Sequence, residues 1–152
     1  MTERPVLERP VLDGAPVGMS APDRELLQAA SAILDARYRE AVHEVAAALR
    51  LADGRVVIGL HVEASAGRAS VCAESAALSA AVVAGSPVVS IVGVLQRPGG
   101  SRHLIEPCGV CAELLGDHAP DASVWVAVDT AFAPVPVATL LPHRRRRAAR
   151  PV

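Results

Sequence analysis

Three cysteines and one glutamate are the residues best placed to do chemistry in this sequence. Glu74 follows Cys72 by two residues, and Cys108 and Cys111 form a C-x-x-C pair directly after Pro107. Three thiolates leave one position of a tetrahedral zinc ion open for water, which is the arrangement of a catalytic site. A carboxylate two residues from one ligand can reach that water without binding the metal, so Glu74 can take up and deliver protons.

Two other interpretations of the cysteines stay open at this level. A closed zinc site would need a fourth protein ligand, for which His103 and His118 are candidates. Closed sites, however, usually combine two C-x-x-C pairs, or one such pair with two histidines. A C-x-x-C pair also occurs as a redox centre, but the thioredoxin-like motif follows the first strand of its fold, whereas Cys108 comes late in this chain. We favour the catalytic zinc site because it uses all three cysteines.

Both cysteine groups fall where a loop meets the start of a predicted helix. Residues 73–84 are expected to form a helix that Gly85 and Pro87 end, and residues 108–115 a shorter helix that Gly116 ends. Free N–H groups and the helix dipole at these positions should lower the pKa of the thiols, which favours metal ligation.

The remaining elements are those that must position these helices. Ser20 can cap a first helix, and Asp53-Gly54-Arg55 is typical of a hairpin turn. The order helix, strand, strand, helix, strand, helix, strand predicts an α/β fold with three α/β/α layers and a mixed sheet of about five strands. In the second half of the chain helices alternate with strands, which indicates right-handed crossovers and parallel pairing of the strands there. The expected strands are 45–51, 56–62, 88–95 and 124–128, with a short extended piece at 103–106.

Composition narrows the class of protein. The 152 residues suit one domain, and with one Phe, one Trp and one Tyr the core must consist of Ala, Val and Leu. All 15 basic residues are arginine, so Schiff-base chemistry on a lysine is excluded. A net charge of -1 argues against nucleic acid as a partner. Because no apolar stretch reaches the roughly 20 residues of a membrane span and no signal peptide is recognisable, we expect a cytoplasmic protein without a membrane partner.

The two ends differ from the middle of the chain. The start is rich in proline and repeats Glu-Arg-Pro-Val-Leu at residues 3–7 and 8–12. We expect an extended arm there, either disordered or lying on a neighbouring subunit. Four consecutive arginines at 144–147 lack aromatic neighbours, which predicts a solvated tail rather than a nucleic-acid site. The expected division is an arm at 1–19, a zinc domain at 20–143 and an Arg-rich tail at 144–152.

With their flanks, these motifs resemble the small cytidine deaminases and their relative blasticidin S deaminase, over about residues 22–143. The two cysteine motifs are similar to the zinc motifs of that family. Gly59-Leu60-His61-Val62-Glu63 resembles its Gly-x-Asn-x-Glu segment. Tyr38 with Val45-Ala46-Ala47-Ala48-Leu49 resembles its segment before the turn, and Leu140-Leu141-Pro142 its C-terminal Leu-Leu-Pro.

The resemblance implies hydrolytic deamination of a free cytosine nucleoside, cytidine or deoxycytidine, with hydroxide attack at C4 and release of ammonia. It implies Zn²⁺ on the three cysteines and Glu74 as the catalytic residue. Glu63 would hold a ribose hydroxyl, and the Ala73 backbone would face the pyrimidine carbonyl. It also implies a small-molecule substrate and a homo-oligomer, a tetramer or dimer, whose subunits complete one another's sites.

Two histidines depart from the family pattern near the expected substrate. His61 stands where the family has Asn, and His43 where it has Phe. Both are candidate substrate-binding residues. They keep open the deamination of a modified aminonucleoside such as blasticidin S, or of another amino-heterocycle. An alternative of another class is a non-catalytic subunit that zinc stabilises.

Two missing arginines raise a question of charge. Ser75 and Ala112 stand where the family often has arginine after the catalytic glutamate and after the last cysteine. Zn²⁺ with three thiolates carries a formal charge of about -1, which weakens its hold on hydroxide. We therefore expect Arg68 or Arg102 to supply the compensating charge from a loop.

Overall fold

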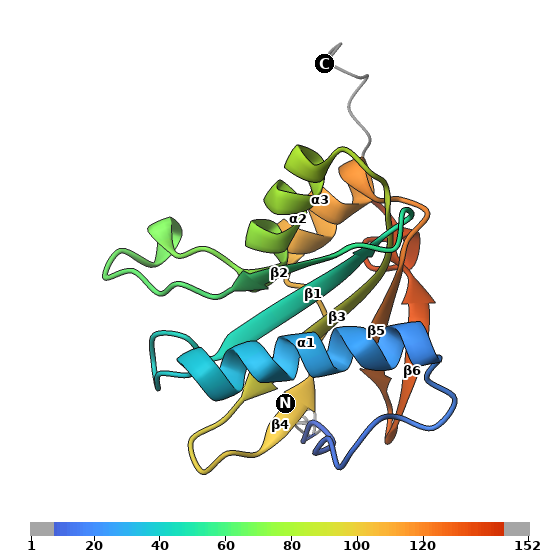
Figure 1. Ribbon diagram of the computed structural model, residues 1–152. Coiled ribbons are helices and arrows are strands. Elements are labelled where there is room, and N and C mark those ends of the chain that lie inside the picture. The colour runs from blue at the N-terminus through green and yellow to red at the C-terminus, as the bar shows by residue number, and fades with distance from the viewer. Residues whose placement is uncertain (1–7, 145–152) are drawn as a thin grey trace, which may run out of the picture.

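A six-stranded mixed sheet is the middle layer of the protein in the computed structural model, which describes residues 8–144 (Figure 1). The strands run in the order β2-β1-β3-β5-β6, and β4 pairs with β3 beside this path. β3 and β5 are parallel, and the other pairs are antiparallel. The strands are β1 Val45–Leu51, β2 Val56–Leu60, β3 Val88–Gln96, β4 Arg102–Leu104, β5 Ser123–Val128 and β6 Ala131–Pro136.

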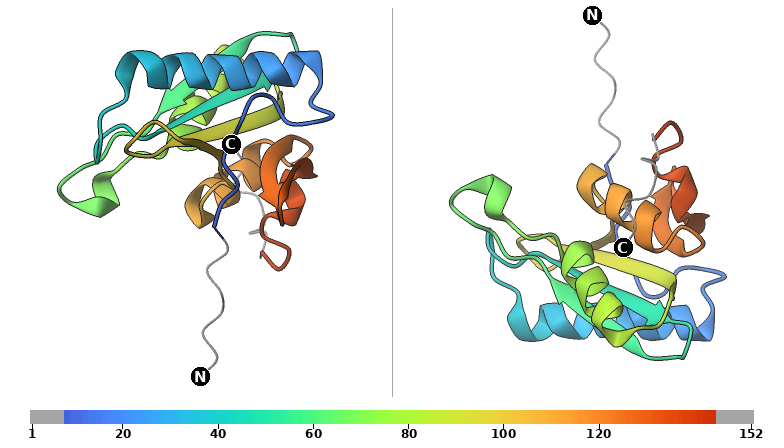
Figure 2. Two further views of the ribbon diagram at one scale, coloured as in Figure 1. Left: turned by 90° about the horizontal axis from the view of Figure 1, so that it is seen from below. Right: turned by 90° about the horizontal axis from the view of Figure 1, so that it is seen from above.

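Helices cover both faces of this sheet. α1 (Ala21–Arg37) runs along one face, and α2 (Ala73–Ala84) and α3 (Gly109–His118) lie on the other (Figure 2). None of the helices in the described part of the chain is long and apolar enough to cross a membrane.

Side chains of β1 alternate between two cores, as the period of a strand requires. Ala46 and Ala48 are buried with the apolar side of α1, and Ala47 and Leu49 are buried with α2. The small alanines let the helices approach the sheet closely, as the lack of aromatic residues predicts. The three-layer α/β/α fold predicted from the sequence is therefore confirmed, with six strands rather than about five.

Gly59 on β2 sets the distance between the sheet and the start of α2. A Cβ at this position would lie 2.5 Å from the backbone nitrogen of Ala77 and closer still to the carbonyl oxygen of Ala73. Both atoms belong to the helix backbone, so they cannot turn aside as a flexible side chain would. Only glycine allows α2 to start where it does.

Asp23 in the first turn of α1 ties the helix to the sheet. Its carboxylate accepts hydrogen bonds from the Ser90 hydroxyl at 2.5 Å, the Trp125 indole at 3.1 Å and the Ser20 hydroxyl at 2.9 Å. Burial alone would raise the pKa of Asp23, but these hydrogen bonds and the charge of Arg50 outweigh it and lower the pKa. The ionised form of Asp23 is thus the one the fold stabilises.

Some bounds of the elements differ from the sequence expectations, and one strand is additional. β2 ends at Leu60 rather than Val62, because Val62 forms a bridge with Val71 instead. α3 continues through Gly116, whose missing side chain makes room for the guanidinium of Arg144. β6 was not predicted at all, because its two prolines weaken the strand pattern and are tolerated only at a sheet edge.

Residues 8–19 lie against their own chain, whereas disorder or contact with a neighbouring subunit was expected. The backbone N–H of Leu12 donates to the Arg102 carbonyl of β4 at 2.7 Å. The Nδ1 of His103 donates to the Pro10 carbonyl at 3.1 Å. The second unit of the tandem repeat is therefore docked beside β4.

Two sequence expectations fall outside the described residues. They concern the first unit of the repeat, at 3–7, and the tail beyond Arg144. Arg144 itself lies against α3, where its guanidinium donates to the Glu113 carbonyl at 2.9 Å and pairs with Asp117.

Candidate metal centre and active site

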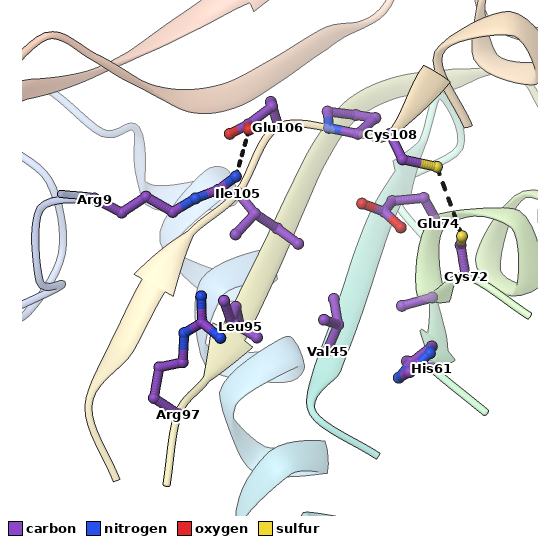
Figure 3. Close-up of a pocket in the computed structure, with 12 residues that line it drawn as sticks. Arg9, Val45, His61, Cys72, Glu74, Leu95, Arg97, Ile105, Glu106 and Cys108 are labelled. Atoms are coloured by element: carbon purple, nitrogen blue, oxygen red, sulfur yellow. Dashed lines mark hydrogen bonds and ion pairs between the residues drawn. The ribbon is translucent and has the colours of Figure 1, made fainter. Parts of the chain in front are cut away.

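The starts of α2 and α3 bring three cysteine sulfurs together. Cys72 is the residue before the first turn of α2, Cys108 holds the same position on α3, and Cys111 lies in the first turn of α3. The three Sγ atoms lie within 4.8 Å of one another, and the Sγ atoms of Cys72 and Cys108 are 3.7 Å apart (Figure 3). A tetrahedral zinc ion with Zn–S bonds of about 2.3 Å needs sulfurs about 3.8 Å apart, so this donor set fits zinc.

Neither histidine proposed for a closed site joins the thiols. Among residues 8–144, the three cysteines alone form a group at ligand spacing. His103 is buried, with its Nδ1 turned to the Pro10 carbonyl of the arm. His118 is exposed at the far end of α3. The described residues thus offer three ligands, which would leave the fourth position of a tetrahedral ion open.

Glu74 is a buried carboxyl group beside the cluster. It lies in the first turn of α2 and is only 4% exposed, and its Oε2 is 3.7 Å from the Sγ of Cys111. Gly93 on β3 faces it, since a Cβ there would lie in van der Waals contact, 3.4 Å from Oε1 of Glu74. Burial raises the pKa of Glu74 above its usual value. A carboxyl group of raised pKa can both accept and return a proton near neutral pH.

The helix starts lower the pKa of only one of the three thiols. Burial opposes ionisation of Cys108, but hydrogen bonds from the backbone N–H of Cys111, from the thiols of Cys72 and Cys111 and from the backbone N–H of Val110 together outweigh it and lower the pKa. Burial raises the pKa of Cys72, and burial with the nearby charge of Glu74 raises that of Cys111. The expected lowering is therefore right for Cys108 and wrong for the other two, whose burial dominates.

Ser75 contacts the cluster, although the sequence marked it only as a missing arginine. Its hydroxyl oxygen lies 3.2 Å from the Sγ of Cys111. A hydroxyl that donates to a thiolate disperses part of its charge, as neighbours of metal ligands commonly do. Ser75 is therefore close enough to donate to a Cys111 thiolate, and a role in the charge balance, which the sequence assigned to an arginine, is a prediction for it.

The two arginines expected to compensate the charge lie elsewhere. Arg102 forms an ion pair of 2.5 Å with Asp35 of α1, on the opposite side of the sheet from α2. Arg68 lies exposed on the short helix η1 (Gly67–Ala69), in a loop that projects from the body of the protein (Figure 1). The expectation that Arg68 or Arg102 faces the metal centre is therefore wrong for this chain's own fold.

A cavity of about 500 Å³ opens beside the cluster. Cys72, Cys108 and Glu74 line one side of it, and apolar side chains lie between that side and the arginines opposite (Figure 3). Its volume is in the range of small-molecule sites, about 300–1,000 Å³. The other lining residues are Arg9, Val45, His61, Ala73, Leu95, Arg97, Ile105, Glu106 and Pro107.

Two of the four expected substrate-binding residues line this cavity, namely His61 and Ala73. Nε2 of His61 lies 3.0 Å from the carboxylate of Glu63, which also accepts a hydrogen bond from the Ser70 hydroxyl at 2.8 Å. Nδ1 of His43 donates to the His61 carbonyl at 2.8 Å. Glu63 and His43 hold His61 in place without lining the cavity, and their contacts with a substrate stay predictions.

Seven lining residues were not among the candidate site residues predicted from the sequence, namely Arg9, Val45, Leu95, Arg97, Ile105, Glu106 and Pro107. Arg97 continues the alternation of Gly93 and Leu95 on one face of β3, so the strand pattern contained a signal for it. Arg9 had no such signal, because its position depends on the docking of residues 8–19 across the fold.

Comparison with known proteins places the chain in a family. No protein-family model matches it. The blasticidin-S deaminase of Bacillus cereus is 31% identical over 134 residues, which cover 85% of this chain and 96% of that protein. The crystal structure of a cytidine deaminase from Burkholderia pseudomallei is 29% identical with a TM-score of 0.66, over 82% of this chain and 98% of the other. That of the Mycobacterium leprae cytidine deaminase is 26% identical with a TM-score of 0.65, over 82% of this chain and 100% of the other. The chain therefore belongs to the cytidine deaminase family, in the broad sense that includes blasticidin-S deaminase.

Proposed function

We propose that this chain is a zinc-dependent hydrolase that converts a free cytosine nucleoside, cytidine or deoxycytidine, to the uracil nucleoside and ammonia. One observation carries the proposal: three thiols lie at zinc spacing, and two of them, Cys72 and Cys108, line one cavity together with the buried carboxyl group of Glu74. The names of the related proteins, a blasticidin-S deaminase and several cytidine deaminases, support the same reaction type.

Each residue of the site has a defined task in this reaction. Cys72, Cys108 and Cys111 would hold the zinc ion, which when bound supplies a Lewis acid that activates water. Glu74 accepts the proton of the attacking water and delivers protons to the ring nitrogen and the departing amino group. One water is consumed and one ammonia leaves, so Glu74 ends the cycle as it began.

The walls of the cavity orient the substrate. Val45, Leu95 and Ile105 offer apolar surface to the two faces of a flat ring. In this proposal the Ala73 backbone, at the start of α2, would face the ring carbonyl, and His61, with Glu63 behind it, would hold a sugar hydroxyl. Holding the ring beside Glu74 in this way converts a slow encounter into a reaction within one complex.

A second candidate is deamination of a modified aminonucleoside such as blasticidin S. It is favoured by the 31% identity to the Bacillus cereus enzyme, which spans 96% of that protein. The chemistry and the roles of the cysteines and Glu74 would be unchanged. His61, which lines the cavity, and His43, which bonds to its carbonyl, replace residues of the cytidine deaminase pattern and would be the residues that respond to a different sugar.

The experiment is a substrate panel on the zinc-loaded protein, with ammonia release measured for cytidine, deoxycytidine, cytosine and blasticidin S. We expect the two nucleosides to be the best substrates, and a chelator-treated sample to serve as the inactive control. A higher kcat/KM for blasticidin S would favour the second candidate. A protein that binds zinc and releases ammonia from none of the four would contradict the nucleoside assignment and favour a non-catalytic zinc-stabilised subunit.

We also propose that the protein is a cytoplasmic homo-oligomer, a tetramer or dimer. The proposal rests on the family, in which subunits complete one another's sites, and on exposed valines on α2 and α3, namely Val82, Val83 and Val110. Light scattering on the protein as it elutes from a size-exclusion column measures the mass of the assembly. A monomer at micromolar concentration would contradict the proposed oligomer.

A further inference from the structure

The cavity has a positively charged side that the deamination chemistry does not use. Arg9 and Arg97 line it opposite Cys72, Cys108 and Glu74, with Leu95 and Ile105 between the two sides (Figure 3). A flat ring placed at Glu74 would therefore point its distal end towards two guanidinium groups.

Arg97 is held at this position by backbone hydrogen bonds. It follows β3, where its N–H donates to the Ser101 carbonyl at 2.9 Å and its carbonyl accepts from Gly100 at 3.0 Å. Within residues 8–144 its guanidinium forms no hydrogen bond or ion pair, so its charge is free to meet a ligand.

Arg9 reaches the cavity because residues 8–12 are docked along β4. The contacts of Leu12 and Pro10 with that strand fix the segment on which Arg9 lies. Nη2 of Arg9 pairs with Oε1 of Glu106 at 2.5 Å, and both side chains are about half exposed. With Arg97 added, this side of the cavity carries one net positive charge.

We propose that Arg97, assisted by Arg9, binds an oxyanion group, a carboxylate or a phosphate, at the end of the substrate remote from the amino group. The inference rests on the proposed function and narrows it to an acidic amino-nucleoside. Guanidinium groups bind carboxylate and phosphate oxygens with paired, charge-assisted hydrogen bonds. Glu106 holds Arg9 in position when the anion is absent.

The charges of the cavity give this binding a direction. With zinc bound, the three thiolates leave a formal charge of about -1 on one side, which is unfavourable for an anion, whereas the arginines on the opposite side attract it. An acidic substrate can therefore enter in one orientation only, with its ring towards Glu74. A neutral nucleoside gains no such guidance.

The test compares cytidine, cytidine 5′-monophosphate and cytidine 5′-carboxylic acid as substrates of the zinc-loaded protein. We expect at least one acidic substrate to exceed cytidine tenfold or more in kcat/KM, and the better of the two identifies carboxylate or phosphate. Arg97→Gln should remove that preference, mainly through KM, and leave cytidine turnover within about threefold. Arg9→Gln should reduce the preference for the acidic substrate less than Arg97→Gln does, because Glu106 already pairs with the Arg9 guanidinium. Arg37→Gln, an exposed change on α1, is the control.

Equal kcat/KM values for the three substrates would overturn the inference and leave the deaminase function intact. The same holds if Arg97→Gln lowers kcat/KM by the same factor for cytidine and for the two acids. If none of the three is deaminated, the proposed function fails. The anion site is then tested by calorimetric binding of the same three compounds. Tighter binding of an acid than of cytidine, lost in Arg97→Gln, would support the anion site, and equal binding would refute it.

Discussion

Replacing Gly59 with alanine should disturb the metal centre without touching any of its residues. The added Cβ would lie 2.5 Å from the Ala77 nitrogen and closer still to the Ala73 oxygen. Ordinary contact begins at 3.4 Å, so the start of α2 must retreat from β2 by about 1 Å, as overpacked sites commonly do. Cys72 and Glu74 lie on that first turn and must move with it.

The size of the effect follows from the atoms involved. Overpacking usually costs about 1–3 kcal/mol, and a clash with backbone rather than side chain puts Gly59→Ala at the upper end. A loss of about 3 kcal/mol lowers the melting temperature by roughly 6–12 °C in a chain of this size. Metal sites tolerate ligand displacements of only about 0.2 Å. Zinc binding should therefore weaken at least about tenfold, and a carboxyl group displaced by about 1 Å should lose roughly 100-fold in turnover.

Thermal unfolding followed by circular dichroism, together with zinc competition against a coloured chelator, measures both effects. Gly67→Ala is the matched control, because the added Cβ meets nothing within 4 Å, and it should change stability by less than about 0.5 kcal/mol. A Gly59→Ala protein that melts and binds zinc like the wild type would refute the view that this close approach positions the metal centre.

Three further changes test other parts of the structure. Ser75→Ala removes the hydroxyl 3.2 Å from the Sγ of Cys111 and should weaken zinc binding about 10-fold or more in the chelator assay; unchanged affinity would refute its role in the charge balance. Because the pKa of Asp23 is lower in the folded state, its stabilisation is complete above the usual value of 3.8 and is lost as pH falls through the lower folded value. Asp23→Asn should therefore cost about 1–2 kcal/mol at neutral pH and progressively less below pH 3.8 in urea unfolding followed by Trp125 fluorescence; a pH-independent loss would refute this linkage. Arg102→Gln should leave zinc affinity unchanged and cost at most about 1 kcal/mol, as exposed ion pairs do; a marked loss of zinc would restore this arginine as the compensating charge.

The sequence predicted the centre of the site because local signals there agree. Gly85, in a left-handed conformation with φ of 72°, ends α2 as predicted, and the helix has the predicted bounds 73–84. With both helix starts located, the cysteine motifs had to lie at the helix N-termini. Their meeting in space follows from the parallel pairing of β3 and β5, which places α2 and α3 on one face.

What the sequence did not predict depends on contacts between distant segments. Gly116 is typical of a helix end in the sequence, but in the structure its missing side chain accommodates Arg144 from the C-terminal segment. Arg9 lines the cavity only because residues 8–12 dock on β4. In the sequence Ser75 stands out only because the family often has arginine at this position. Its hydrogen bond to Cys111 depends on how α2 faces α3.

The most direct test of the proposed function is the turnover of Glu74→Gln measured together with its zinc content. The amide keeps the shape of the side chain but cannot accept or deliver the proton, so we expect kcat to fall by about 10²–10⁴-fold with cytidine or the best substrate of the panel. We also expect one zinc per chain and a melting temperature no lower than that of the wild type, because the buried side chain no longer has to ionise. Turnover within a few-fold of the wild type, or loss of zinc along with activity, would contradict the assignment of Glu74 as the proton carrier beside a three-cysteine zinc site.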